Sequence, residues 1–517
     1  MIKNTFYIIL TVLFVSCGTG LPKNLRAPKT EFRGVWIATV VNIDWPSSGE
    51  QDFEKKKEAY LQLLDFYEEL NFNAAIVQIR TAGDAFYPSE YAPWSRFLTG
   101  KEGEATSEYN TLLSWMIEET HKRGMEFHAW LNPYRATFDL NTEILSETHD
   151  YNTHPEWMIK YGKKYYYNPG LPEVQAHLLN IINEVVDNYQ IDAIHFDDYF
   201  YPYKIKDEEF DDLESYKKFG QQYSSIEDWR RQNINSLIKN IHDSIEARKP
   251  WVQFGISPFG VWRNASVDPR GSDTKAGQTT YDDLYADALA WIENGWIDYM
   301  APQLYWSLYY PAASHAKLMD WWSRNTKNTQ LYIGNGPYKI RNNADKAWKR
   351  KKELPKQLTL ARKTKEVDGN IFFSAKSLIQ KNKDVANYLK RKYYKYPALT
   401  PPAKTTKTLP EAPKLTSIIQ KGDAYVMHLD SVGPASPNLL LYGFKSDRHI
   451  DIQTGKNILK KIYLQERTQL SLNTTLFRHH KVFAITFLDR YGVESEPFLF
   501  TFNTMKNGNI SIKRYQP

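Results

Sequence analysis

The chain has 517 residues, of which 42% are hydrophobic, 24% charged and 15% aromatic. This composition excludes a mostly disordered chain, and the length suits two or three domains. The net charge of +6, from 66 basic and 60 acidic residues, is small and scattered, so nothing indicates binding to nucleic acid. The single cysteine, Cys17, excludes intrachain disulfides, cysteine zinc sites and a catalytic thiol in the body of the chain.

The N-terminus has the pattern of a lipoprotein signal peptide. Lys3 precedes an apolar run over 6–15, which is too short to span a membrane. The run ends in a lipobox, so we expect residues 1–16 to be removed, Cys17 to be lipidated and 17–30 to form a tether. An ordinary signal peptide with a chance cysteine is the alternative. No acidic cluster follows Cys17, which favours a periplasm-facing anchor over the cell surface.

From Glu31 onward, short β-branched or aromatic runs alternate with amphipathic helical patterns. The expected strands are 32–40, 73–80, 125–134, 191–199, 253–259, 297–306, 330–336 and 370–375. The expected helices include 53–70, 109–123, 173–189, 226–248, 281–294 and 346–365. Eight β-then-α units predict a closed (β/α)8 TIM barrel over residues 31–395, because parallel strands need helical crossovers and eight strands close the sheet. The longest loops follow strands three, four and five, at the end of the barrel where such folds keep their chemistry.

The C-terminal part of the chain differs in composition and in hydrophobic pattern. Residues 396–410 are rich in proline and predict a stiff, exposed linker. Short alternating runs without a strong helix then predict a small all-β sandwich over 411–505. Its segment 482–495 resembles the F–G hairpin of a fibronectin type III domain, and 506–517 are expected to be a loose tail.

Strand four carries the sharpest chemical signal. Because side chains alternate along a strand, His195 and Asp197 share a face and should point into the barrel near its mouth, with Asp198 at the rim. A buried acid is costly unless it is paired, so its presence here suggests a working group with a tuned pKa. The alternative is that Asp197 and Asp198 form hydrogen bonds that only hold loops.

Hydrolysis of a glycosidic bond normally needs two carboxyl groups, one to protonate the leaving oxygen and one to act as nucleophile or base. Asp197 or Asp198 can fill one of these roles. Asp44 and Asp84, near the same mouth, are the candidates for the other. Asp44 could instead cap a turn, and Asp84 could pair with Arg80.

Other polar and aromatic residues at the strand ends are candidates for binding substrate. They are Arg80, His128, Trp130, Asn132, His195, Tyr199, Arg263, Gln303, Tyr305 and Trp306. Trp130, Tyr199, Tyr201, Trp262, Tyr305 and Trp306 could stack on sugars, with packing in the core as an equal alternative. We expect the two histidines to bind hydroxyls or orient a carboxylate, since no close HxH or HxxxH spacing indicates a metal. No cofactor is expected.

Five segments, 32–39, 42–46, 129–135, 195–202 and 301–306, together resemble the glycoside-hydrolase-like 10 family. The resemblance covers about residues 31–395. It implies a bacterial envelope glycoside hydrolase whose barrel is often followed by a fibronectin-like module, and a substrate made of N-acetylated sugars. Some members cut peptidoglycan glycan strands that have lost their stem peptides. Strand four also resembles the chitinase pattern of spaced acids, but Tyr199 stands where that pattern has its acid glutamate, so the chitinase mechanism is not carried over.

Together these features favour a lipid-anchored glycoside hydrolase of the cell envelope. Its partners would be a polysaccharide and, through Cys17, a membrane, with a possible envelope protein at the C-terminal module. One alternative is a glycan-binding lipoprotein without turnover. Another is a surface lipoprotein that degrades dietary or host polysaccharide. The linkage, the stereochemical outcome and the roles of the individual aspartates stay open at this stage.

Overall fold

The computed structural model describes residues 25–403, 408–433, 436–504 and 510–515. The predicted signal peptide and Cys17 therefore lie outside the described residues. Within the described ranges, none of the helices combines the length and apolar character that crossing a membrane requires.

A closed barrel of eight strands forms the first domain, in the order β1-β10-β9-β8-β7-β6-β3-β2. Its strands are β1 (Phe32–Ile37), β2 (Ala74–Arg80), β3 (Glu126–Leu131), β6 (Ala193–Phe196), β7 (Gln253–Ile256), β8 (Tyr299–Met300), β9 (Gln330–Asn335) and β10 (Gly369–Phe372). Each pairs in parallel with its neighbours, so the predicted barrel is confirmed. All of these strands except β2 end earlier than predicted, because the polar segments after them leave the sheet as loops.

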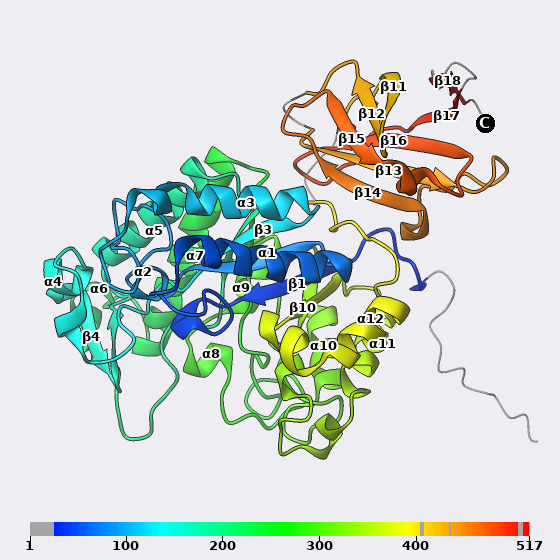
Figure 1. The fold of residues 1–517 in the computed structure, drawn as a ribbon. Helices are drawn as coiled ribbons and strands as arrows, with labels where there is room; N and C mark the ends of the chain where they lie inside the picture. The colour runs from blue at the N-terminus through cyan, green and yellow to red at the C-terminus, as the bar shows by residue number, and fades with distance from the viewer. Residues whose placement is uncertain (1–24, 404–407, 434–435, 505–509, 516–517) are drawn as a thin grey trace, which may run out of the picture.

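Helices cover the outside of the barrel (Figure 1). The longer ones are α1 (Phe53–Glu69), α3 (Leu112–Lys122), α5 (Pro172–Asn188), α7 (Ile226–Arg248), α10 (His315–Asn325), α11 (Glu353–Lys363) and α12 (Lys383–Lys392). Short ones are α2 (Arg96–Thr99), α4 (Asp150–Thr153), α6 (Leu213–Phe219), α8 (Thr280–Asp283) and α9 (Ala288–Glu293). The helix predicted over 281–294 is broken into α8 and α9, and Tyr285 between them has a positive φ of 51°. Such a backbone is incompatible with a continuous helix.

The helices pack through one apolar face. In α5, Val174, Leu178, Ile181 and Val185 are buried at the spacing of successive helical turns. The facing side of β6 supplies Ile194 and Phe196 to the same core. The alternate residue Ala193 belongs to the separate core inside the barrel. This is the division of faces that the period of two predicted.

Long loops follow β3, β6 and β7. The loop after β3 contains α4 and a small hairpin of β4 (Met158–Tyr161) and β5 (Lys164–Tyr167). The loop after β6 contains α6, and that after β7 contains α8. These insertions surround the carboxyl ends of the strands, which form the mouth of the barrel.

Two antiparallel sheets form the C-terminal domain, in the orders β11-β12-β15 and β14-β13-β16-β17-β18. The strands are β11 (Leu415–Lys421), β12 (Ala424–Leu429), β13 (Asn438–Phe444), β14 (Ile458–Tyr463), β15 (Gln469–Asn473), β16 (Val482–Leu488), β17 (Phe498–Thr504) and β18 (Ile510–Arg514). The predicted β-sandwich is confirmed, whereas its fibronectin type III character stays a prediction. The prediction of a loose tail was wrong for 510–514, because β18 pairs with β17 and packs Ile510 and Ile512 against the core.

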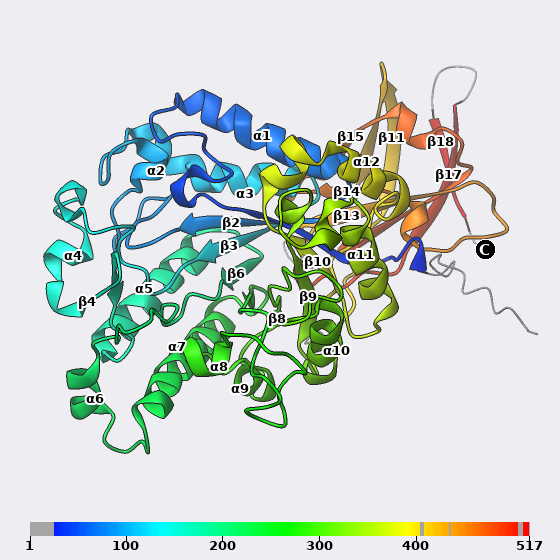
Figure 2. The same cartoon turned by 90° about the horizontal axis from the view of Figure 1, so that it is seen from below.

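The sandwich lies beside the end of the barrel where the strands begin (Figure 2). The described parts of the predicted tether (17–30) and linker (396–410) make contacts at this end of the barrel. Lys29 forms an ion pair with Glu494 of the sandwich, and its carbonyl accepts from Leu399 N at 2.8 Å. Pro402 O accepts from Gln330 Nε2 of β9 at 2.8 Å. The described ends of the tether and linker are therefore part of the interface and not free spacers.

Candidate active site

A cleft of about 1320 Å³ opens at the mouth of the barrel. Aspartates and aromatic side chains from several strand ends line it, as is usual for active sites of this fold. Its polar lining includes Gln78, Asp197, Asp198, Ser257 and Gln303. Its aromatic lining comprises Trp36, Phe97, Trp130, Phe138, Tyr199, Tyr203, Tyr305 and Phe373.

Asp197 follows β6 directly and is only 6% exposed. Asn132 Nδ2 donates to its Oδ2 at 2.5 Å and Trp130 Nε1 at 3.3 Å, while the backbone N–H of Tyr199 donates to Oδ1 at 3.2 Å. Burial, and then the charge of Asp198, raise the pKa of Asp197 to about 7. This carboxyl therefore exchanges its proton close to neutral pH.

Asp198 is buried beside it, with 3% of its surface exposed. The Tyr203 hydroxyl donates to its Oδ2, and Gln303 forms a second side-chain hydrogen bond with it. Burial raises the pKa of Asp198, while these hydrogen bonds oppose the rise. Two adjacent buried acids cannot both ionise cheaply, which is consistent with the raised pKa of both carboxyls.

The structure draws the other two predicted catalytic aspartates away from the cleft. Asp44 accepts from the backbone N–H of Ala38 at 2.9 Å, the N–H of Lys376 at 2.9 Å and the Ser374 hydroxyl at 2.8 Å. It thereby ties the loop after β1 to the segment after β10. Asp84 Oδ1 accepts from Thr81 and Ala82 within its own turn. Neither lines the cleft, so we remove both from the catalytic candidates.

Arg80 and Arg263 also serve structural contacts. Arg80 is 1% exposed and donates to the carbonyl of Asp84, not to its carboxylate. Arg263 forms ion pairs with Asp268 at 3.1 Å and Asp282 at 2.7 Å. Because neither arginine lines the cleft, a substrate contact is not supported for either of them.

Both predicted histidines lie inside the barrel, below the cleft. Trp36 Nε1 donates to His195 Nε2 at 3.1 Å, so His195 carries its proton on Nδ1 and donates to the Tyr299 hydroxyl at 2.9 Å. That hydroxyl donates to His128 Nδ1 at 2.9 Å, and His128 Nε2 donates to Glu126 at 3.1 Å. Burial, with nearby His128, holds the pKa of His195 well below its usual value. His195 therefore stays neutral and positions Trp36.

The predicted aromatic platforms divide into two groups. Trp130, Tyr199 and Tyr305 line the cleft, as does the predicted polar residue Gln303. Asn132 does not line it but donates a hydrogen bond to Asp197. In contrast, Tyr201 and Trp262 are each 1% exposed and belong to the core between barrel and helices. Trp306 packs edge-on against Phe259 at 5.5 Å between ring centroids and does not line the cleft. Tyr201 and Trp262 therefore pack in the core, and Trp306 is partly buried against it.

Sequence reasoning missed several residues of the cleft. Arg135 lies three residues after Asn132 in a segment that was recognised, but nothing in its spacing shows that it turns into the cleft. Lys164 comes from the inserted β4–β5 hairpin, whose position the barrel pattern does not predict. Trp36 and Tyr203 could have been found from their places at the ends of strands one and four.

In the described ranges, no group of three or more His, Cys, Asp or Glu side chains is placed to hold a metal ion. The chemistry that the residues of the cleft themselves offer is proton transfer by the two aspartates.

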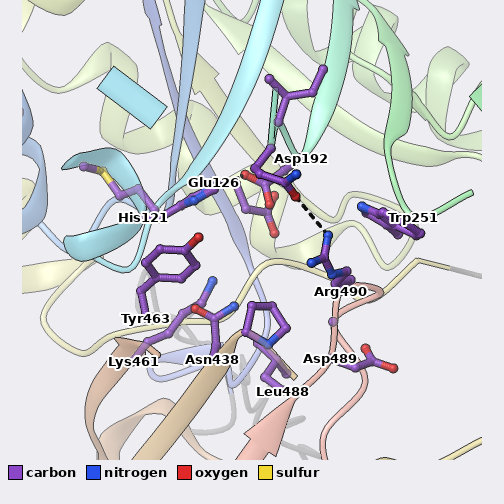
Figure 3. A pocket seen from close by; sticks show the side chains of 15 residues that line it. His121, Glu126, Asp192, Trp251, Asn438, Lys461, Tyr463, Leu488, Asp489 and Arg490 are labelled. Carbon is purple, nitrogen blue, oxygen red and sulfur yellow. Dashed lines mark hydrogen bonds and ion pairs between the residues drawn. The ribbon is translucent and has the colours of Figure 1, made fainter. Parts of the chain in front are cut away.

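A second, smaller pocket lies between barrel and sandwich, where Tyr463 contacts the ring of His121 and Arg490 lies over Trp251 (Figure 3).

A family model and two curated relatives agree on one family. The model of the family "Glycosyl hydrolase-like 10" matches residues 31–350. Glycosyl hydrolase YngK of Bacillus subtilis is 48% identical over 406 residues, which are 77% of this chain and 79% of the relative. Glycosyl hydrolase DigH of Escherichia coli K12 is 36% identical over 402 residues, 71% of this chain and 91% of the relative. Among solved structures, the glycoside hydrolase domain of PgaB (BpsB) from Bordetella bronchiseptica aligns over 70% of this chain and 99% of its own, with 10% identity and a TM-score of 0.44.

Proposed function

This chain belongs to the glycosyl hydrolase-like 10 family, and we propose that it is a glycoside hydrolase of the bacterial cell envelope that cuts peptide-free peptidoglycan strands. The observation that carries the enzymatic part is the pair Asp197 and Asp198. Both are buried, both line the cleft, and both have raised pKa values. Perturbed acids gathered in a cleft are typical of catalytic sites.

In this proposal one carboxyl of the pair holds a proton near pH 7 and gives it to the leaving glycosidic oxygen. The other, as a carboxylate, stabilises the oxocarbenium-like transition state or activates the attacking water. The donors on Asp197 fix its orientation, and Tyr203 does the same for Asp198. Fixed donors that need no rearrangement at the moment of reaction lower the barrier.

The aromatic lining supports a sugar polymer as substrate. Trp36, Trp130, Tyr199 and Tyr305 present flat apolar faces on the walls around the aspartates. Such faces can stack on pyranose rings and hold several units of a strand. The choice of peptide-free peptidoglycan rests on the family resemblance, in which some members cut that polymer.

The anchor is a separate part of the proposal. It rests on the lipobox before Cys17, and a periplasm-facing anchor is favoured because no acidic cluster follows. In cells of the native host, a Cys17→Ser variant should move from the membrane fraction to the soluble fraction and should not incorporate labelled fatty acid. Unchanged membrane association would contradict a lipid anchor at this residue.

Release of soluble sugars from purified peptidoglycan tests the function, with and without prior removal of stem peptides by an amidase. We expect release from the peptide-free strands and its loss in Asp197→Asn and Asp198→Asn. Asp211→Asn, an exposed aspartate outside the cleft, is the matched control and should keep full activity. If the unaltered chain binds the strands but releases no sugars, the protein is a glycan-binding protein and not an enzyme. Release only from dietary or host polysaccharides would replace the substrate.

A further inference from the structure

Arg135 is a buried cation without a carboxylate partner. Its side chain lines the cleft and is 6% exposed. Among the described residues, no acidic oxygen lies within 4.0 Å of it. Its guanidinium donates to Thr81 O at 3.3 Å and lies 4.6 Å over the Tyr199 ring, while Nε has no hydrogen-bond partner. A guanidinium has five donors, so most of its capacity is unused.

Lys164 adds a second cation to the same cleft. It is half-buried at the start of β5, and no ion pair to an acidic residue is found for it within the described chain. Burial and then the charge of Arg135 lower the pKa of Lys164, while the charge of Asp139 partly opposes this. The third cation of the lining, Arg96, differs because Asp139 lies 3.5 Å from it. Its charge is therefore already compensated.

Holding two like charges together in a part-buried cleft is unfavourable unless a ligand offsets them. Neither Asp197 nor Asp198 lies within ion-pair distance of Arg135, and burial raises the pKa of both carboxyls. The two aspartates therefore do not pair with the Arg135 guanidinium. A planar guanidinium with a nearby ammonium is well suited to a carboxylate.

We propose that Arg135 and Lys164 bind a carboxylate carried by a sugar of the substrate, next to the scissile bond. This inference rests on the proposed function and deepens it. In peptidoglycan, removal of the stem peptide converts the amide on the lactyl ether of muramic acid into a free carboxylate. The same two cations would meet only a neutral and much bulkier amide on a peptide-bearing strand. Carboxylate recognition therefore gives a chemical reason for a preference for peptide-free strands.

The test compares two substrates that differ only in this charge. Peptide-free strands are used as they are, or after carbodiimide coupling with methylamine converts each carboxylate to a methylamide. Binding is measured on the full chain carrying Asp198→Asn, so that the strands stay intact, and hydrolysis on the chain without that change. We expect methylamidation to weaken binding by about 10- to 100-fold, as for the loss of hydrogen bonds to a charged group.

Three variants locate the effect. Arg135→Gln and Lys164→Gln should bind free-carboxylate strands as weakly as methylamidated ones and should lose the discrimination. Lys163→Gln, the exposed neighbour on the same hairpin, should keep it. Arg135→Lys keeps the charge and should retain part of the discrimination, which separates recognition from a folding defect. Thermal unfolding of each variant checks the fold, and Lys164→Gln tests the proposal even if Arg135→Gln does not fold.

The outcomes separate this inference from the proposed function. Equal binding of free and methylamidated strands overturns carboxylate recognition, even if the strands are hydrolysed. Discrimination without hydrolysis supports carboxylate recognition and contradicts the enzyme. A polymer of N-acetylglucosamine and glucuronic acid is the third arm, because it carries its carboxylate on the sugar ring. Tighter binding of that polymer supports the carboxylate site but replaces peptidoglycan with a uronic acid glycan.

Discussion

At the end of the barrel where the strands begin, buried charges are matched. Glu31 lies 2.7 Å from Arg33 and 2.6 Å from Arg362, and these cations hold its pKa below the usual value although burial opposes this. At the mouth, Asp197 has a raised pKa and Arg135 has no ion pair among the described residues. The buried charges at the end where the strands begin are thus paired within the chain, whereas Arg135 at the mouth has no carboxylate partner among the described residues. The experiments below can break or sharpen this contrast.

The largest effect is expected at the mouth. Asp197→Asn and Asp198→Asn should each lower kcat/KM on peptide-free strands by about 10²- to 10⁴-fold, the usual contribution of a general acid or base. Neither change should lower the thermal unfolding temperature appreciably, since each removes a carboxyl whose ionisation is unfavourable in the fold.

The same two variants can identify the proton donor. On an aryl glycoside whose leaving group needs no protonation, the variant that lacks the general acid should recover much of its activity, and the other should not. A strong loss of stability in both variants, with proportionate loss of activity, would instead mean that these aspartates only hold loops.

Glu31→Gln tests the paired charges at the end of the barrel where the strands begin. It leaves two buried guanidinium groups facing a neutral amide, so the free energy of unfolding should fall by about 3–5 kcal/mol. Denaturant unfolding followed by circular dichroism measures this. The activity per folded molecule should be unchanged. Glu69→Gln, whose ion pair with Lys390 is exposed at the surface, is the control and should unfold as the unaltered chain does.

The pH dependence of kcat/KM tests whether a protonated carboxyl of the Asp197 and Asp198 pair is needed for activity. Because the pKa of Asp197 is about 7, kcat/KM should fall roughly tenfold per pH unit above that value as the acid form is lost. The charge of Arg135 lowers the pKa of both aspartates, so Arg135→Gln should move this limb to higher pH. A limb that stays in place would mean that Arg135 does not act on the pair.

Stability has the corresponding sign. A carboxyl whose pKa is raised in the folded state binds its proton more tightly there than in the unfolded chain. The contribution of Asp197 to stability therefore falls as the pH rises from about 4 to about 7, and then levels off. Asp197→Asn should flatten this part of the stability profile, which thermal unfolding at successive pH values can measure.

The smallest effect is expected at the contact between the domains. Arg490 is exposed, donates to Gln190 Oε1 at 3.1 Å and lies 4.8 Å over the Trp251 ring. Arg490→Ala should lower stability by no more than about 1 kcal/mol. Proteolysis of the linker between the two domains should become faster, while hydrolysis of glycan strands should be unchanged. A loss of hydrolysis would show that the sandwich acts on the mouth.

The fold was largely predictable because hydrophobic periodicity reports directly on strands and helices. The alternation along strand four placed His195 and Asp197 on the inner face correctly. Periodicity says nothing of how a polar group is satisfied, however. Asp44 lies near the mouth as predicted, but it accepts hydrogen bonds from Ala38 in its own loop and from Ser374 and Lys376 in the distant segment after β10. Arg135 was missed for the opposite reason, since a lack of partners leaves no pattern in the sequence.

The row of side chains from Trp36 through His195, Tyr299 and His128 to Glu126 occupies the barrel axis, and Thr400 meets its far end with a hydrogen bond of 2.5 Å. The axis is thereby plugged beneath the two aspartates. Molecules can therefore reach the two aspartates only from the mouth of the barrel. If the chain hydrolyses a glycan as proposed, the substrate, the attacking water and the products all have to use the mouth of the barrel, so slow release of a product would also delay the next substrate.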